Sequence, residues 1–142
     1  MKYWIYVISK DLVRAGIDGG FIQARLGTAA LGLLRQEDVI FFYSPGTLFR
    51  AGTILQAFTA VARVADDAPD EVKASARVHQ WRRKVRSLAG EEAAIEPLIS
   101  RLGFIEDKMN WRLSLRRGMF EIGEDDARCI AAAMRTDIGT TA

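Results

Sequence analysis

The chain has 142 residues, of which 49% are hydrophobic and 27% are charged, and its net charge is +2. This length suits one domain with a single well-buried core. The single cysteine excludes an intramolecular disulfide and a cysteine cluster that holds zinc. Because no apolar run is long enough to span a membrane and no signal peptide is present, we expect a cytoplasmic protein.

The first predicted element is a central strand at residues 2–8. Its aromatic and β-branched residues place apolar side chains on both faces, which is typical of a strand that is covered on both sides. Ser9 suits the N-cap of a short helix that we expect to end at Gly16. The glycine pair at residues 19–20 then favours a turn, and residues 21–23 form a short extended piece.

The next part of the chain predicts two further strands. Residues 24–35 contain several small residues and give no clear assignment. A dense run of β-forming residues at 39–43 indicates a buried strand. The Ser-Pro-Gly sequence at residues 44–46 is typical of a turn, so we expect that strand to stop there. Residues 55–64 predict a longer strand.

The most basic stretch of the chain, residues 78–88, is interpreted as a strand, since a helix would spread its charges around the whole cylinder. Alternate side chains of a strand share a face. One face would carry His79, Trp81, Arg83, Val85 and Ser87, and the other Gln80, Arg82, Lys84 and Arg86. Cations suit phosphates and a flat ring suits a base, although a solvated face with one core tryptophan fits the pattern equally well. The acidic segment before it, residues 66–71, predicts a surface loop.

The last third of the chain predicts two helices and a strand. Apolar residues between 95 and 102 recur at helical spacing, and Gly103 would end that helix. From residue 111 to 116 apolar and basic residues alternate, which predicts a second basic strand that continues to residue 122. Acidic residues at 124–126 suit the first turn of a C-terminal helix. Residues 136–142 are expected to fray.

These elements together predict an α+β domain, with a curved or barrel-like sheet and short helices over its open edges. Few residues suggest catalysis or metal binding. His79 is the only histidine, and no nucleophile motif, metal-ligand spacing or phosphate-binding glycine motif is present. We therefore expect no catalytic residue, no metal and no cofactor. The alternatives are an enzyme that acts on a nucleotide or nucleoside through His79, and a module whose basic faces meet an acidic protein.

Short motifs spread over nearly the whole chain resemble those of EVE-domain proteins. They are Lys2-Tyr3-Trp4-Ile5, Gly19-Gly20-Phe21-Ile22-Gln23, Phe42-Tyr43-Ser44-Pro45, Gln56-Ala57-Phe58, Trp81-Arg82-Arg83, Pro97-Leu98-Ile99, and Asn110-Trp111 with Arg116, Gly118 and Phe120-Glu121-Ile122. The resemblance implies that residues 1–142 are a single EVE domain with a PUA-like mixed β pseudobarrel, related to the YTH domains that hold a methylated RNA base. It also implies a non-catalytic reader of modified bases in RNA or DNA.

Carried over to this chain, the resemblance implies a base pocket flanked by cations, in which rings stack on a flipped base and polar groups bond to its edge. The pocket residues are Trp4, Ser9, Phe21, Gln23, Ser44, Pro45, Trp81 and Trp111. The phosphate contacts are Arg82, Arg83 and Arg116. For Trp4, core packing is the competing interpretation. Lys84 and Arg117 depart from the acid and the aromatic residue that the family often has at these positions, which adds charge beside the pocket.

Overall fold

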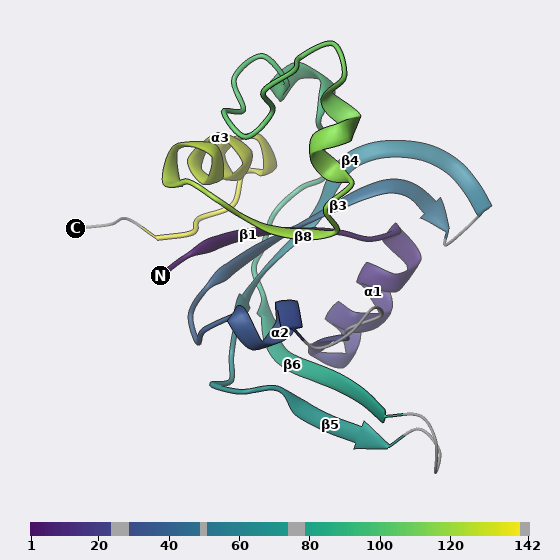
Figure 1. Cartoon of the computed structure of the whole chain (residues 1–142), viewed down its shortest axis with the longest axis vertical. Coiled ribbons are helices and arrows are strands. Elements are labelled where there is room, and N and C mark those ends of the chain that lie inside the picture. The colour runs from purple at the N-terminus through teal and green to yellow at the C-terminus, as the bar shows by residue number, and fades with distance from the viewer. Residues whose placement is uncertain (24–28, 49–50, 74–78, 140–142) are drawn as a thin grey trace.

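The computed structural model describes residues 1–23, 29–48, 51–73 and 79–139, which fold into a curled mixed sheet with helices on both of its faces (Figure 1). The strands are β1 (Tyr3–Val7), β2 (Phe21–Gln23), β3 (Val39–Leu48), β4 (Ala51–Val64), β5 (Asp70–Lys73), β6 (His79–Ser87), β7 (Ala93–Ala94) and β8 (Met119–Ile122). The helices are α1 (Lys10–Gly19), α2 (Ala29–Leu33) and α3 (Glu124–Met134), and two 3₁₀ helices are η1 (Glu96–Leu98) and η2 (Trp111–Leu115).

The strands lie side by side in the order β2-β6-β4-β3-β1-β8, while β5 pairs with β6 and β7 pairs with β4. β1 runs parallel to β3 and antiparallel to β8. A parallel pair needs a crossover connection, and here α1, β2 and α2 make it. The ribbon of β5 and β6 extends from the body of the sheet on the side of α1 and α2 (Figure 1).

The sheet separates two hydrophobic cores. The α3-side core joins one face of β1 and β3 to η1, η2 and α3, and it includes Tyr3 and Ile5 of β1. The α1-side core joins the other face to α1, α2, β2 and β6, and it includes Trp4. The prediction of a central strand at residues 2–8 with both faces covered is therefore confirmed.

The end of α1 differs from the sequence prediction. The helix continues past Gly16 to Gly19, and Gly20 ends it with a φ of 76° in the left-handed region that glycine adopts readily. Gly16 has a different role, because a Cβ there would lie 2.6 Å from the carbonyl oxygen of Phe21. The absence of a side chain at this position lets β2 approach the helix closely.

The predicted turn at residues 44–46 is also wrong, since β3 continues to Leu48. β1 pairs with β3 only as far as Tyr43, so Pro45 lies where β3 pairs with β4 alone. Proline is tolerated at such an edge because its missing N–H has no strand to bond to. The register between β3 and β4 shifts on both sides of Gly46, which absorbs the irregularity as a bulge.

One helical prediction and one strand prediction in the last third need correction. Residues 95–102 form η1 followed by turns rather than an α-helix, and residues 111–115 form η2 rather than a strand. Trp111 and Leu115 are both buried although Leu113 between them is 52% exposed. Trp111, Leu113 and Leu115 fit a strand because they lie two residues apart. In η2 only the first and the last of them, which lie four residues apart, are buried.

The C-terminal helix and the long strands agree with the prediction. α3 begins with three acidic residues and buries the expected apolar stripe. β6 covers most of the basic stretch, and β4 includes residues 55–64. The acidic segment is only partly a loop, since β5 begins at Asp70. In the segment that we expect to fray, Ile138 joins the α3-side core, and residues 140–142 lie outside the described part.

Candidate functional site

The clearest candidate surface lies on the antiparallel pair of β2 and β6. Phe21 lies opposite Lys84, and Gln23 lies opposite Arg82. Directly opposed residues share one face of a ladder. We call the face that carries Arg82, Lys84 and Arg86 of β6 together with Phe21 and Gln23 of β2 the cationic face. The predicted cationic ladder is therefore present and gains an aromatic residue from β2.

The cations of this face are held in different ways. The guanidinium of Arg82 lies over the ring of Phe21, 4.0 Å from its centroid. Lys84 and Arg86 are exposed, and Arg86 Nη2 lies 3.7 Å from Glu37 Oε2. Because both partners of that ion pair are more than half exposed, it holds Arg86 weakly. The face thus offers three positive charges in a row, one of them stacked on an aromatic ring.

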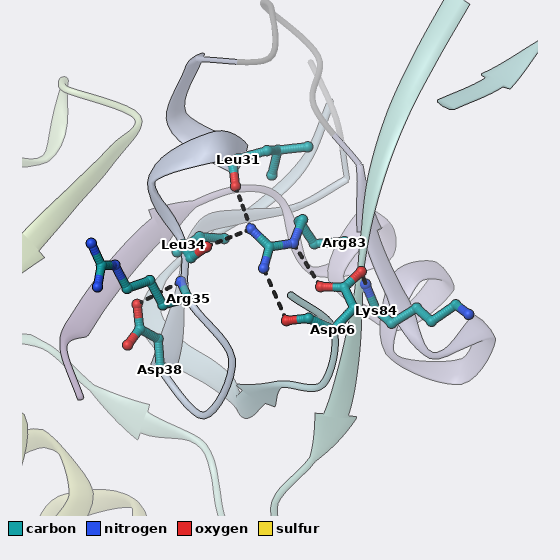
Figure 2. Close-up of polar contacts among 7 residues, drawn as sticks. All are labelled: Leu31, Leu34, Arg35, Asp38, Asp66, Arg83 and Lys84. Carbon is teal, nitrogen blue, oxygen red and sulfur yellow. Dashed lines mark hydrogen bonds and ion pairs between the residues drawn. The ribbon is translucent and has the colours of Figure 1, made fainter. Parts of the chain in front are cut away.

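Arg83 points the other way, and its predicted phosphate contact is wrong for this structure. Its side chain is 0% exposed. Nε donates to Asp66 Oδ1 at 2.6 Å and Nη2 to the carbonyl oxygen of Asp66 at 3.1 Å, while Nη1 donates to the carbonyl oxygens of Leu31 and Leu34, each at 2.6 Å (Figure 2). The guanidinium is therefore enclosed between β6, α2 and the segment that follows β4. A phosphate has no access to it.

Trp4 is a core residue rather than a pocket residue. Its side chain is 5% exposed, and its indole N–H donates to Asp38 Oδ2 at 3.0 Å. Asp38 also accepts hydrogen bonds from the main-chain N–H groups of Lys2 and Arg35, the second of which is drawn in Figure 2. A buried carboxylate with three donors is well satisfied, so the ring of Trp4 is fixed in the core and has no room for a base.

The structure does not bring Trp81 and Trp111 into one pocket. Trp81 is partly exposed and packs against the α1-side core, whereas Trp111 is 8% exposed and belongs to the α3-side core. Arg116 follows η2 as its C-cap and is exposed there. The two tryptophans therefore lie in different cores, on opposite faces of the sheet.

Ser9 and Ser44 follow the end of the pairing between β1 and β3, where the N–H of Ile8 donates to the carbonyl oxygen of Tyr43 at 2.9 Å. Both hydroxyls are buried and already bonded. Ser9 Oγ donates to Asp11 Oδ1 at 2.6 Å, and the hydroxyls of Ser44 and Thr59 lie 2.7 Å apart.

Pro45, next to this pair, is exposed. Gln23 is partly exposed. Its main-chain carbonyl oxygen accepts a hydrogen bond from the Tyr6 hydroxyl at 2.9 Å, which ties β2 to β1. Of the predicted pocket residues, those that keep exposed surface are thus Phe21, Gln23, Pro45 and Trp81.

The described residues give little support for chemistry at this surface. Among them, no group of three or more His, Cys, Asp or Glu residues is arranged to hold a metal ion. The side chain of His79 lies outside the described part, so its predicted role is untested. Burial raises the pKa of Tyr43 to about 12, against an opposing effect of Arg112, so this phenol stays protonated near neutral pH. No helix in the described ranges is long and apolar enough to cross a membrane.

Sequence reasoning missed two acids that organise this region, Asp38, which is buried, and Asp66, which is partly exposed. The sequence pattern assigns no role to Asp38, and it places Asp66 in a surface loop. Each has an acidic neighbour, Glu37 or Asp67, and nothing in the local pattern distinguishes them from surface carboxylates. Only the tertiary fold shows that Asp66 meets Arg83 and that Asp38 meets Trp4.

Comparison with known proteins gives a family match over almost the whole chain. The sequence model of the EVE domain matches residues 2–133. A "UPF0310 protein" of Mycobacterium avium is 43% identical over 135 residues, which cover 94% of this chain and 98% of the relative. The "UPF0310 protein msl3206" of Mesorhizobium japonicum is 42% identical over 135 residues, covering 93% of this chain and 91% of the relative.

Solved structures with low sequence identity share the fold. A Rhodopseudomonas palustris protein solved by NMR has a TM-score of 0.60 at 14% identity, covering 95% of this chain and 94% of that one. The ASCH protein of Zymomonas mobilis has a TM-score of 0.59 at 6% identity, covering 96% of each chain. At such identities the likeness concerns the fold alone, and it confirms the predicted α+β, PUA-like architecture.

Proposed function

The chain belongs to the EVE domain family, and from this premise we propose that it is a non-catalytic module that binds RNA or DNA and reads a modified base. The observation that carries the proposal is the cationic face, where Arg82, Lys84 and Arg86 follow one another on β6 and Arg82 is stacked on Phe21. Cations at strand spacing neutralise successive phosphates, and this electrostatic contribution dominates nucleic-acid affinity.

The base itself would be held by aromatic residues of β2 and β6 that keep accessible surface. Phe21 shares the cationic face, whereas Trp81 lies on the opposite face of β6. Trp81 is the strongest candidate, because its ring packs on the α1-side core with one part still exposed. A rigidly mounted ring stacks on a flipped base at little entropic cost. Phe21 and Gln23 on β2 are the neighbouring candidates, while Ser9 and Ser44 would have to exchange their present hydrogen bonds to reach a base edge.

Binding of short oligonucleotides tests the proposal. Modified and unmodified DNA and RNA of matched sequence are compared with the wild-type chain and the variant Trp81→Ala. We expect a preference for one modified base, and we expect Trp81→Ala to lose about 1 to 3 kcal/mol of that binding. Equal affinity for modified and unmodified strands would leave only an electrostatic surface and would refute base reading.

Salt dependence tests the phosphate contacts separately. For three contacts on a single strand, the slope of log affinity against log salt concentration is expected to be about −2. The variant Lys84→Ala should make this slope shallower by about 0.7. The matched control is Arg101→Ala, which removes an exposed cation from the α3 side and should leave the slope unchanged. An affinity that does not depend on salt would contradict the role of the cationic face.

A further inference from the structure

A hollow of about 420 Å³ lies on the α3 side of the molecule, beside β4, η1 and η2. Gln56, Glu96, Ser100, Lys108, Trp111 and Arg112 supply its polar and aromatic groups. This volume is within the range of small-molecule sites. We propose that the hollow binds a nucleoside phosphate, at a site separate from the cationic face.

The flat part of this site is a stack of Arg112 on Trp111. The guanidinium of Arg112 lies over the indole, 4.4 Å from the ring centroid. Trp111 is anchored in the α3-side core, whereas Arg112 is exposed and lines the hollow. Planar guanidinium groups and aromatic rings are the surfaces on which proteins stack nucleobases. The stack therefore favours a planar ligand over a flexible one.

Gln56 holds this platform in place. In the amide orientation that satisfies both groups, its side-chain oxygen accepts from Arg112 Nε at 3.0 Å and from Nη2 at 2.9 Å. Both bonds converge on this one oxygen, which holds the edge of the guanidinium that carries Nε and Nη2. Gln56 itself has a φ of 52°, an uncommon value for a residue with a side chain, within β4. Strain of this kind is concentrated at ligand sites, where the surrounding structure maintains it.

The charges around the hollow favour an anionic group next to the planar one. Lys108 and Arg112 face a single acid, Glu96, among the lining residues. Lys108 Nζ donates to the carbonyl oxygen of Leu102 at 2.7 Å, which fixes the ammonium and leaves it further N–H groups for a phosphate. Glu96 and Ser100 offer acceptors for the amino groups on a base edge. A base joined to a phosphate uses both features, whereas an acidic peptide uses only the charges.

NMR titration of the whole chain with adenosine, guanosine, cytidine and uridine monophosphates tests this site. The resonances of the Trp111 indole and the Gln56 amide are followed, together with the Met109 methyl group, which lies at the rim and is 90% exposed. Arg112→Lys keeps the charge but removes the planar group, and we expect it to weaken binding about tenfold. Arg101→Lys is the matched control, since Arg101 is exposed nearby and does not line the hollow.

The ligand arms separate the two sources of a nucleoside phosphate. A 5′-phosphorylated trinucleotide that binds at least tenfold more tightly than the mononucleotide would assign the end of a nucleic-acid strand, and equal affinity would assign a free nucleotide. The unphosphorylated nucleoside should bind more weakly than the mononucleotide.

Four results would overturn the proposal: no shifts at millimolar nucleotide, shifts at Phe21 instead of Trp111, inorganic phosphate binding as tightly as the mononucleotide, or an acidic peptide displacing it at lower concentration. Arg82→Ala changes the cationic face and should leave nucleotide binding in the hollow unchanged. A failure of the proposal for the hollow is therefore distinguishable from a failure of the proposed nucleic-acid binding.

Discussion

Adjacent basic residues of β6 have different roles, because their side chains point to opposite faces of the strand. Arg83 is enclosed, and it connects β6 to Asp66 and to the main chain of α2. Its neighbour Lys84 is exposed on the cationic face. Two adjacent basic residues thus serve stability and surface charge respectively, and the difference follows from the two-residue period of a strand.

The variant Arg83→Met should therefore destabilise the fold by about 3–5 kcal/mol, because it leaves Asp66 Oδ1 and three carbonyl oxygens without their donor. Urea unfolding of this variant and of Lys84→Met measures the difference. The exposed control should change the free energy of unfolding by less than about 0.5 kcal/mol. Similar small losses for both would show that the buried contact contributes little.

Tyr43 gives a prediction for alkaline pH. Its folded pKa of about 12 lies above the value of about 10 for an exposed phenol. The folded state therefore favours the protonated phenol, and this contribution is fully present below pH 10 and lost as the pH rises towards 12. Between these limits we expect the wild type to lose roughly 2–3 kcal/mol relative to Tyr43→Phe, which cannot ionise. Parallel pH dependence of unfolding in the two proteins would contradict this.

At the scale of elements, α3 does more than cover the sheet. Asp126 in its first turn is 8% exposed and accepts from the main-chain N–H groups of Gly103 at 2.7 Å and Phe104 at 2.9 Å. These bonds fix the turn after η1 against the helix. The carboxylate thus joins two elements that the sequence places more than twenty residues apart.

Removing this carboxylate by Asp126→Ala should cost about 2–3 kcal/mol of unfolding free energy, since both bonds are made to a charged acceptor. Asp125→Ala is the control in the same helical turn, because Asp125 is exposed. It should lose less than about 1 kcal/mol, from its interaction with the helix dipole. Thermal or urea unfolding compares the two, and equal losses would assign the whole effect to the dipole.

At the scale of the whole molecule, the sheet places Trp81 and Trp111 in different cores. Trp111 is buried in the α3-side core, and Trp81 lies at the margin of the α1-side core. Trp111→Ala should destabilise the fold by about 3–5 kcal/mol, as large core truncations do. We expect Trp81→Ala to cost less stability and to remove the preference for a modified base. Loss of that preference in a folded Trp111→Ala protein would contradict the division.

The sequence by itself determined the local elements whose patterns were unambiguous. The central strand, β4, β6 and α3 each have a clear period or composition, and local sterics and side-chain alternation follow directly from such patterns. The motif resemblance, which depends on order along the chain, also predicted the family and the PUA-like fold correctly.

Only the tertiary structure decided which polar side chains became internal. Arg83 and Lys84 are both basic and adjacent, and Asp66 and Asp67 are both acidic, yet one of each pair forms the buried contact. The partners come from segments that are 17 or more residues apart. Their contact therefore depends on the position of β6 beside β4 and α2. The same long-range geometry placed Trp81 and Trp111 on opposite sides of the sheet, because a local pattern specifies the faces of a strand but not what packs against each face.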